Sequence, residues 1–295
     1  MVVAARRRRP ISQDKLIAIL MVLPSIIAIA IFVYGFIAVN GWSALTNWKG
    51  LAPMNRFGPI SFPAADFTGL RNFQIIFNDP RFQIDLRNNA VFTVAFLVGC
   101  TVLGLLLAIL LDQHIKGESF FRNVFLFPMA LSFVVTGTIW RWVFLDLGWV
   151  TNRNLALAAV IVAAVWQMSG FTMAMFLAAL RGIPDELREA ARVDGASEIS
   201  LYRHIVIPLI NPIILSALII LGHISLKIFD LVYVMTGSSK SLGFVTDMPS
   251  LYMWQLAFND NLYGRAAAIS AIMLVLVAIV IVPYLVVNRR SEAGS

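Results

Sequence analysis

Between two apolar segments the chain carries the charged stretch PDELREAARVDGASEISLYRHIVIPLINP, which runs from Pro184 to Pro212. Proline suits the first turn of a helix, and acidic residues there interact favourably with the helix dipole, so a helix is predicted to follow Pro184. Gly195 is expected to end this helix in a left-handed conformation, and Ser197 to cap a second helix. The stretch therefore predicts an exposed helix–turn–helix within a hydrophobic protein.

The composition predicts an all-α integral membrane protein. Of the 295 residues, 59% are hydrophobic and 13% are charged, and the mean hydropathy is +0.82. Soluble domains average about 25% charged residues, and a soluble chain of this size could not cover so much apolar surface. The apolar runs are about 20 residues long and do not alternate as barrel strands do. Cys100, the lone cysteine, lies within one run and is expected to be a small core residue.

Six candidate transmembrane helices are predicted within a single domain that covers residues 16–288. Each is long enough to cross about 30 Å of hydrocarbon. The fifth is over-long, so it is expected to tilt, to break, or to begin at the membrane surface. The predicted spans are 16–39, 90–111, 124–145, 155–180, 205–234 and 266–287.

Basic residues predict that both ends of the chain are cytoplasmic. The N-terminal segment 1–15 is strongly basic, and Arg289 and Arg290 begin the tail 289–295. Because basic residues favour the cytoplasmic side, this orientation places the loop 181–204 inside the cell and the segment 40–89 outside. A cleaved signal peptide is the alternative for the N-terminus, but the apolar stretch is too long for one.

Common catalytic and ligand-binding motifs are absent from the sequence. It contains no G-x-x-x-x-G-K-[ST] phosphate loop, no H-E-x-x-H zinc motif and no G-x-S-x-G nucleophile turn. The three histidines lie far apart, and the net charge of +7 is spread along the chain rather than gathered on one face. We therefore expect no catalytic residue, no bound metal or cofactor, and no nucleic-acid binding.

The first helix of the charged stretch is expected to pack against another protein. Small side chains on one of its faces would let a partner approach closely, whereas the alternative is a plain surface loop between spans. Two ion pairs at a spacing of three residues are also expected, Asp185 with Arg188 and Glu189 with Arg192. The small residues of the face are Ala190, Ala191 and Gly195.

The segment EAARVDGASEISLYRHIVIPLINP (189–212) resembles the signature of permease subunits of ATP-binding-cassette (ABC) importers. Its D-G-A-S form at 194–197 is similar to the carbohydrate branch, the MalF-like (type I) subunits of sugar importers. Five further segments resemble that branch in the same order: 67–82, 87–96, FFRNVFLFPMALSFVVTGTIWRWVF (120–144), 165–184 and LKIFDLVYVMTG (226–237). The sequence departs from the branch at 238–241, where SSKS replaces the usual Gly-Gly-Gly-Pro.

This resemblance implies that the chain helps to import a sugar across a prokaryotic cytoplasmic membrane. The loop 181–204 would be the coupling helix, docked into a separate ATPase that binds ATP and Mg. Further partners would be a second homologous permease, an extracytoplasmic sugar-binding protein and membrane lipid. Glu189 would pair with a basic residue of the ATPase, and Asp194 would fix the turn. The implied coupling residues are Glu189, Ala190, Ala191, Asp194, Gly195, Ala196 and Ser197.

Polar residues inside the predicted spans are candidates for the solute pathway, because in a membrane they usually face a cavity or each other. In the fifth span, spacings of four and three place His223, Lys227 and Asp230 on one helical face. Lys227 and Asp230 could instead form a purely structural ion pair. In the fourth span a structural role is favoured, since Ser and Thr often bond to their own helix. The candidates are His223, Ser225, Lys227, Phe229, Asp230, Tyr233, Trp166, Gln167, Ser169 and Thr172.

Two alternative functions stay open on the sequence alone. A secondary transporter driven by an ion gradient would use the charged residues of the fifth span, but it leaves the charged stretch 184–212 unexplained. An ABC permease for another polar solute, such as glycerol phosphate, should carry more unpaired basic groups in its cavity. The sequence does not identify the sugar.

Overall fold

The computed structural model describes residues 13–48, 65–113, 115–237 and 242–293. Within these ranges no strand forms, and Thr46 and Phe67 make the only bridge between extended segments. The predicted all-α fold is confirmed. The elements are α1 (Gln13–Ile29), η1 (Ala30–Gly35), α2 (Phe36–Ala44), α3 (Arg71–Phe77), α4 (Pro80–Asp112), α5 (Glu118–Leu126), η2 (Phe127–Ala130), α6 (Phe133–Asp146), α7 (Ala156–Arg181), α8 (Asp185–Val193), α9 (Glu198–Leu201), η3 (Tyr202–Val206), α10 (Ile207–Leu226), α11 (Asp230–Thr236), α12 (Pro249–Phe258) and α13 (Tyr263–Ala293).

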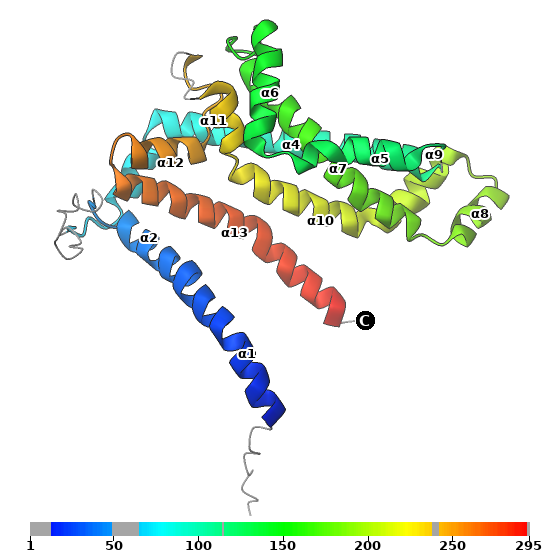
Figure 1. Cartoon of the computed structure of the whole chain (residues 1–295), viewed down its shortest axis with the longest axis horizontal. Helices are drawn as coiled ribbons and strands as arrows, with labels where there is room; N and C mark the ends of the chain where they lie inside the picture. The colour runs from blue at the N-terminus through cyan, green and yellow to red at the C-terminus, as the bar shows by residue number, and fades with distance from the viewer. Residues whose placement is uncertain (1–12, 49–64, 114, 238–241, 294–295) are drawn as a thin grey trace, which may run out of the picture.

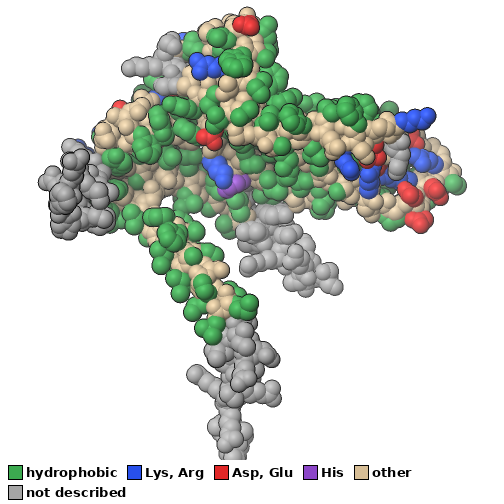
Figure 2. All heavy atoms as spheres, in the orientation of Figure 1, with side chains coloured by type: hydrophobic (Ala, Val, Ile, Leu, Met, Phe, Trp, Pro, Cys, Tyr) green, Lys and Arg blue, Asp and Glu red, His purple; other side chains and the backbone are tan. Residues whose placement is uncertain are grey.

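The molecule has two distinct ends, which lie far apart along its long axis (Figure 1). The helices α4, α5, α7 and α10 run along this axis, with α8 and α9 at one end and α11 and α12 near the other. We call these the α8 end and the α12 end. In Figure 2 hydrophobic side chains cover most of the length between them, whereas basic and acidic side chains gather at the α8 end. This distribution is that of a protein whose long sides face lipid.

The core of the fold is the packing of α4 against α7, which depends on a close approach of their backbones. A Cβ atom at Gly104 of α4 would lie 2.1 Å from Oγ1 of Thr172 on α7, so any other residue would force a shift there. Thr172 donates a hydrogen bond from Oγ1 to the carbonyl oxygen of Cys100 at 2.7 Å. Small residues and interhelical hydrogen bonds of this kind hold membrane helices together.

The described residues contain four single helices that are long and apolar enough to cross a membrane, or five spans if one bent pair is included. The bent pair joins Glu118–Ala130 to Phe133–Asp146 at an angle of 99°. The helix α13 covers the sixth predicted span, although its shorter apolar part Tyr263–Ile279 does not meet the same test. The count of six spans and the orientation of the ends therefore stay predictions. The single helices are Ile19–Ala44, Pro80–Asp112, Ala156–Arg181 and Glu198–Leu226.

The predicted span 124–145 is not one straight helix, because the chain turns sharply at Leu131. Pro128 lies in the short 3-10 helix η2, and Leu131 is extended. The side chain of Ser132 then caps α6 by accepting a hydrogen bond from the backbone N–H of Val135 at 3.3 Å. Gln167 of α7 donates to the carbonyl oxygen of Leu131 at 2.8 Å, so the interrupted backbone is bonded from a neighbouring helix.

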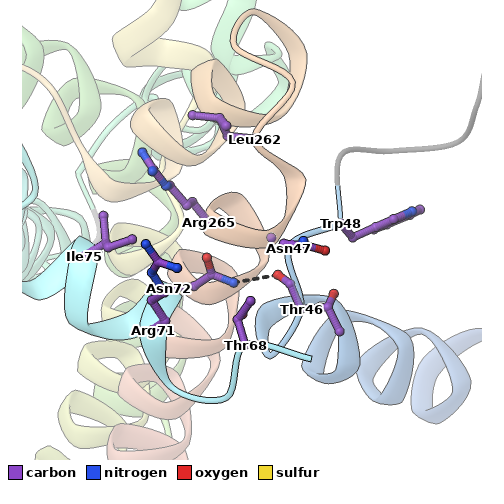
Figure 3. Close-up of a pocket in the computed structure, with 10 residues that line it drawn as sticks. Thr46, Asn47, Trp48, Thr68, Arg71, Asn72, Ile75, Leu262 and Arg265 are labelled. Atoms are coloured by element: carbon purple, nitrogen blue, oxygen red, sulfur yellow. Dashed lines mark hydrogen bonds between the residues drawn. The ribbon is translucent and has the colours of Figure 1, made fainter. Parts of the chain in front are cut away.

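At the α12 end, backbone carbonyl groups in and after α2 contact a side chain of α3 and a glycine of α13. Asn72 of α3 donates from Nδ2 to the carbonyl oxygens of Ala44 (2.9 Å) and Thr46 (2.8 Å), beside a small pocket shown in Figure 3. A Cβ atom at Gly264, near the start of α13, would lie 2.5 Å from the Thr46 oxygen. The last turn of the first apolar helix is therefore held against the last helix of the chain.

The same end contains a half-buried arginine with partners distant in sequence. Arg81 of α4 forms an ion pair with Asp247 at 2.6 Å and donates a hydrogen bond to Gln255 at 2.7 Å. Its guanidinium lies between the rings of Phe244 and Tyr252, 4.4 and 4.3 Å from their centroids. Cation–π contacts and an ion pair thus connect α4 to the segment before α12 and to α12 itself.

Candidate functional site

The helix–turn–helix predicted from the charged stretch is present as α8 and α9. The backbone N–H of Asp194 donates to the carbonyl oxygen of Ala190 at 3.0 Å, and Gly195 has a φ of +81°. This left-handed conformation ends α8 and is easily reached only by glycine. The hydroxyl of Ser197 accepts a hydrogen bond from the N–H of Ser200 at 3.3 Å and so caps α9.

An arginine on α8 ties this helix to the membrane helices. Nη1 of Arg188 forms an ion pair with Oδ2 of Asp112, the last residue of α4, at 2.7 Å. Nη2 donates to the carbonyl oxygen of Leu180 on α7, also at 2.7 Å. The two paired side chains are only 14% and 3% exposed, so water screens the pair weakly. The expected pairing of Arg188 with Asp185 was therefore wrong, because Arg188 pairs with the buried carboxylate of Asp112 on α4 instead.

A second arginine closes the turn between the two short helices. Nε of Arg192 donates to Oε1 of Glu198 at 2.9 Å, with both side chains exposed. This hydrogen bond raises the pKa of the Arg192 guanidinium, with the negative charge of Glu198 adding to the effect. The expected pairing of Arg192 with Glu189 does not form. Instead, Glu189 is exposed and has no hydrogen bond or ion pair within the described ranges.

The small residues expected to form one docking face are divided between the interior and the surface. Ala191 is only 6% exposed and belongs to the same buried hydrophobic cluster of this chain as Leu111 and Leu201. Ala190 and Gly195 are exposed, and Ala196 is half-buried. Ala191 therefore differs from the expectation, since it anchors α8 and offers little surface to a partner.

Two large apolar side chains that were not predicted as site residues project from the same loop. Val193 at the end of α8 is 87% exposed, and Ile199 in α9 is 81% exposed. Single exposed apolar residues are common, but here they flank the exposed turn formed by Asp194 and Gly195. Glu189, four residues before Val193 on α8, is exposed too, so this loop offers a partner both apolar side chains and a carboxylate. We call Glu189, Val193, Asp194, Gly195 and Ile199 the docking surface.

The candidate pathway in the fifth predicted span is broken rather than continuous. The helix α10 ends at Leu226, and α11 begins at Asp230. Asn89 of α4 donates to the carbonyl oxygen of Ser225 at 3.1 Å, and Ser250 donates to that of Ile228. These donors satisfy backbone groups that the break leaves free.

This break corrects the expectation that His223, Lys227 and Asp230 share one helical face. Lys227 and Asp230 are both exposed and form no ion pair with each other, so the structural ion pair considered as an alternative is also absent between these two described residues. Nδ1 of His223 is buried and has no hydrogen-bond partner among the described groups. Ser225 is buried and donates from Oγ to the carbonyl oxygen of Gly222 at 2.8 Å.

Aromatic rings adjoin the break. Phe229 and Tyr233 are stacked with their centroids 5.4 Å apart, as their spacing of four residues permits. Trp254 of α12 joins them at 6.0 Å from Phe229 and 5.1 Å from Tyr233. Trp254 is not among the residues predicted from the sequence, because its 21-residue separation from Tyr233 gives no local signal for the contact.

The candidates in the fourth predicted span lie largely inside the chain. Gln167 bonds to Leu131, Thr172 bonds to Cys100, and the hydroxyl of Ser169 donates to the carbonyl oxygen of Trp166 at 3.3 Å. All three polar side chains are buried, whereas the half-buried ring of Trp166 lies edge-on to Trp140 at 5.6 Å. Their positions give no support to a role in contacting a solute and favour the structural role.

In the described ranges no three His, Cys, Asp or Glu side chains come together in a way that could hold a metal ion.

Comparison with known proteins identifies the family. Residues 100–292 match the family described as binding-protein-dependent transport system inner membrane component. The chain is 37% identical to a probable ABC transporter permease protein of Pyrococcus horikoshii, over 95% of this chain and 98% of that protein. It is 36% identical to the xylose/arabinose import permease protein XacH of Haloferax volcanii, over 88% of this chain and 84% of that one.

A solved structure shares the fold. A chain of a bacterial alginate ABC transporter, in complex with a periplasmic protein bound to alginate pentasaccharide, aligns with a TM-score of 0.76 and 19% identity. The alignment covers 94% of this chain and 96% of that chain.

The chain belongs to the family of binding-protein-dependent transport system inner membrane components. It is a permease subunit of an ABC importer and a multi-pass protein of the cytoplasmic membrane. The resemblance found in the stretch 189–212 is thereby confirmed, and a secondary transporter driven by an ion gradient is not favoured.

Proposed function

We propose that this chain forms half of the translocation pathway of an ATP-driven sugar importer and carries out no chemistry itself. A separate ATPase dimer would bind ATP and Mg, and a second homologous permease, expected to be a different chain, would form the other half of the pathway. An extracytoplasmic binding protein would deliver the sugar. Similarity to a xylose/arabinose import permease over most of the chain supports a sugar as the solute.

The docking surface is the observation that carries this proposal. It combines an unpaired carboxylate at Glu189 with the exposed apolar side chains of Val193 and Ile199. A buried interface forms readily from apolar contacts around one charge pair. We infer that the ATPase docks here, and that the α8 end is cytoplasmic for that reason.

Coupling would follow from the way in which α8 is anchored. Arg188 joins α8 to the ends of α4 and α7 through short, shielded contacts. A movement of α8 imposed by the ATPase would therefore displace both helices, as in other transitions based on rigid-body shifts. The break between α10 and α11 gives the α12 end some freedom to rearrange separately.

The sugar would pass beside this break. His223, Lys227 and Asp230 offer polar groups for hydroxyls, and the rings of Phe229, Tyr233 and Trp254 offer apolar faces. Discontinuous helices at the substrate site are a recurrent feature of transporters. An anionic solute such as glycerol phosphate is less well matched, because the exposed carboxylate of Asp230 lies among the pathway candidates and would repel an anion.

The first test measures sugar-stimulated ATP hydrolysis in proteoliposomes that contain this chain, the second permease and the ATPase dimer, with the binding protein added. We expect Glu189→Ala to reduce stimulation about tenfold or more, since it removes one member of an interfacial charge pair. Gly195→Asp should have a similar effect, because its φ of +81° is unfavourable for a residue with a side chain. Asp260→Ala is the matched control, since it removes an exposed carboxylate near α12.

Stimulation must also require the binding protein loaded with sugar, and a panel of sugars and glycerol phosphate then identifies the solute. Solute uptake without any ATPase subunit, or full activity of both docking variants, would contradict the proposal.

A further inference from the structure

A groove of about 500 Å³ lies between α5 and α7 near the α8 end. Gly170 lies beside Phe125 and Arg181 pairs with Glu118, so the two helices run antiparallel here, and residues of both line the groove. Its volume lies within the range of small-ligand sites. Nothing in the proposed transport function uses this groove, since it is separate from both the docking surface and the break after α10.

The groove exists because α5 meets α7 closely at one point and is bridged to it at another. A Cβ atom at Gly170 of α7 would lie only 2.0 Å from the carbonyl oxygen of Phe125, so the two backbones touch there. At the far end, Glu118 forms an ion pair with Arg181 at 2.8 Å. Between these contacts the small side chains of Ala174 and Ala178 leave space that the fold does not fill.

One side of the groove is basic. Arg122 is half-buried in it and has no hydrogen bond or ion pair with any residue in the described ranges. Arg181 contributes a second guanidinium, which is held in place by Glu118. A half-buried arginine without a partner favours an anion with oxygen acceptors, because the guanidinium presents several N–H donors in one plane.

Apart from the polar side chain of Asn123, the remaining lining of the groove is apolar. Leu126 and Leu177 lie next to the basic part of the groove. On the same segment, Phe120 is 67% exposed and Phe127 is 62% exposed. A soluble anion would contact only the basic part of the groove, whereas a molecule with a phosphate and hydrocarbon chains would contact both the arginines and the apolar lining.

We propose that this groove binds an anionic phospholipid. The lipid phosphate would contact Arg122 and Arg181, and the first part of an acyl chain would lie along Leu126, Leu177 and Ala178. Basic pockets between membrane helices are known to hold acidic lipid headgroups. The helix α5 reaches toward the α8 end (Figure 1), where charged side chains give way to hydrophobic ones (Figure 2), and a lipid headgroup lies at such a boundary.

The test uses the purified full-length chain in neutral detergent, with bound lipids counted by native mass spectrometry. Phosphatidylglycerol is titrated against phosphatidylcholine. We expect Arg122→Gln to weaken phosphatidylglycerol binding about fivefold, the factor that one basic residue near an anionic headgroup contributes. Arg153→Gln is the matched control, because Arg153 is an exposed arginine that precedes the opposite end of α7.

A second variant, Ala178→Leu, fills the groove without changing the charge and should weaken binding by a similar factor. Equal binding of the two lipids would overturn the proposal, as would unchanged binding by Arg122→Gln and Ala178→Leu. Displacement of the lipid by millimolar glycerol phosphate would instead identify a site for soluble anions. ATPase co-purification tests the docking surface separately, so failure of either idea leaves the other standing.

Discussion

Glycines decide how closely the helices of this permease can approach. Gly104 and Gly170 both lie on faces where another residue occupies the position of a Cβ atom, at calculated separations of 2.1 and 2.0 Å. The obstacle at Gly104 is a threonine side chain, but at Gly170 it is the backbone carbonyl of Phe125. A side chain can rotate away, whereas a helix backbone must move as a unit, so Gly170 is the stricter position.

Gly170→Ala should therefore destabilise the chain by about 1–3 kcal/mol, the usual cost of overpacking. The midpoint of thermal unfolding in detergent, followed by fluorescence-detected size exclusion, measures this. Gly41→Ala is the control within another helix, because no atom lies within 4 Å of a Cβ there. It should leave stability unchanged or slightly raise it. Equal midpoints for the two variants would show that α5 does not touch α7 at Gly170.

Residue-level prediction succeeded where the signal was local and failed where it was distant. The left-handed Gly195 and the Ser197 cap follow from residues within four positions of them. Arg188 also has suitable acidic neighbours in sequence, but it bonds to Asp112, 76 residues earlier. A half-buried pair outweighs an exposed one because water screens it less, and burial is not visible in a single sequence.

At the scale of elements, α8 is a short helix that depends on its attachment. It has nine residues, which is too short for stability on its own, so Arg188 and Ala191 must hold it in place. The loop that carries the docking surface is therefore fixed to the membrane helices and is not a flexible linker.

Arg188→Gln should cost roughly 3–5 kcal/mol, because it leaves the buried carboxylate of Asp112 without its partner. Thermal unfolding gives the cost, and the ratio of sugar transported to ATP hydrolysed in the reconstituted complex reports on coupling. We expect this ratio to fall even at temperatures where the variant is folded.

Arg192→Gln on the same helix breaks only an exposed pair and should change the unfolding midpoint little. The double variant Arg188→Gln/Asp112→Asn should regain part of the lost stability, since no unpaired carboxylate remains. A coupling ratio unchanged in Arg188→Gln would show that the movement of α8 reaches the membrane helices by another route.

Element boundaries could be predicted only in part. The apolar runs located α4 and α7 well, because each is a single helix with a continuous hydrophobic stretch. The positions of the breaks before α6 and after Leu226 could not be predicted from the sequence. Side chains from other helices bond to the carbonyl groups that each break leaves free, and these contacts are not visible in the sequence. Gln167 does so at Leu131, and Asn89 does so at Ser225. The same long-range packing hid Trp254 from the candidate pathway.

For the whole molecule, the orientation in the membrane is the expectation with the widest consequences. The chain has one cysteine, Cys100, which is fully buried and should react little with a polar reagent. New cysteines at Val193, near the α8 end, and at Asp260, near the α12 end, would therefore be labelled against a low background. We expect a membrane-impermeant maleimide to label Asp260→Cys in whole cells and Val193→Cys only in inverted vesicles.

Labelling of both positions from the same side would contradict the topology with two cytoplasmic ends. The comparison also tests the proposed site of ATPase docking, because bound ATPase should protect Val193→Cys in inverted vesicles but leave Asp260→Cys unaffected.

The partners of Arg81 determine when this part of the protein can fold during synthesis. Arg81 leaves the ribosome 166 residues before Asp247, with which it pairs. At about 5–20 residues per second, translation leaves this arginine waiting on the order of 10 to 30 s. Throughout that interval Arg81 lacks its ion-pair partner Asp247, its hydrogen-bond partner Gln255 and the two rings that enclose its guanidinium. The nascent helix must therefore keep its first turn in water or against the insertion machinery, and the α12 end closes only when synthesis is nearly complete.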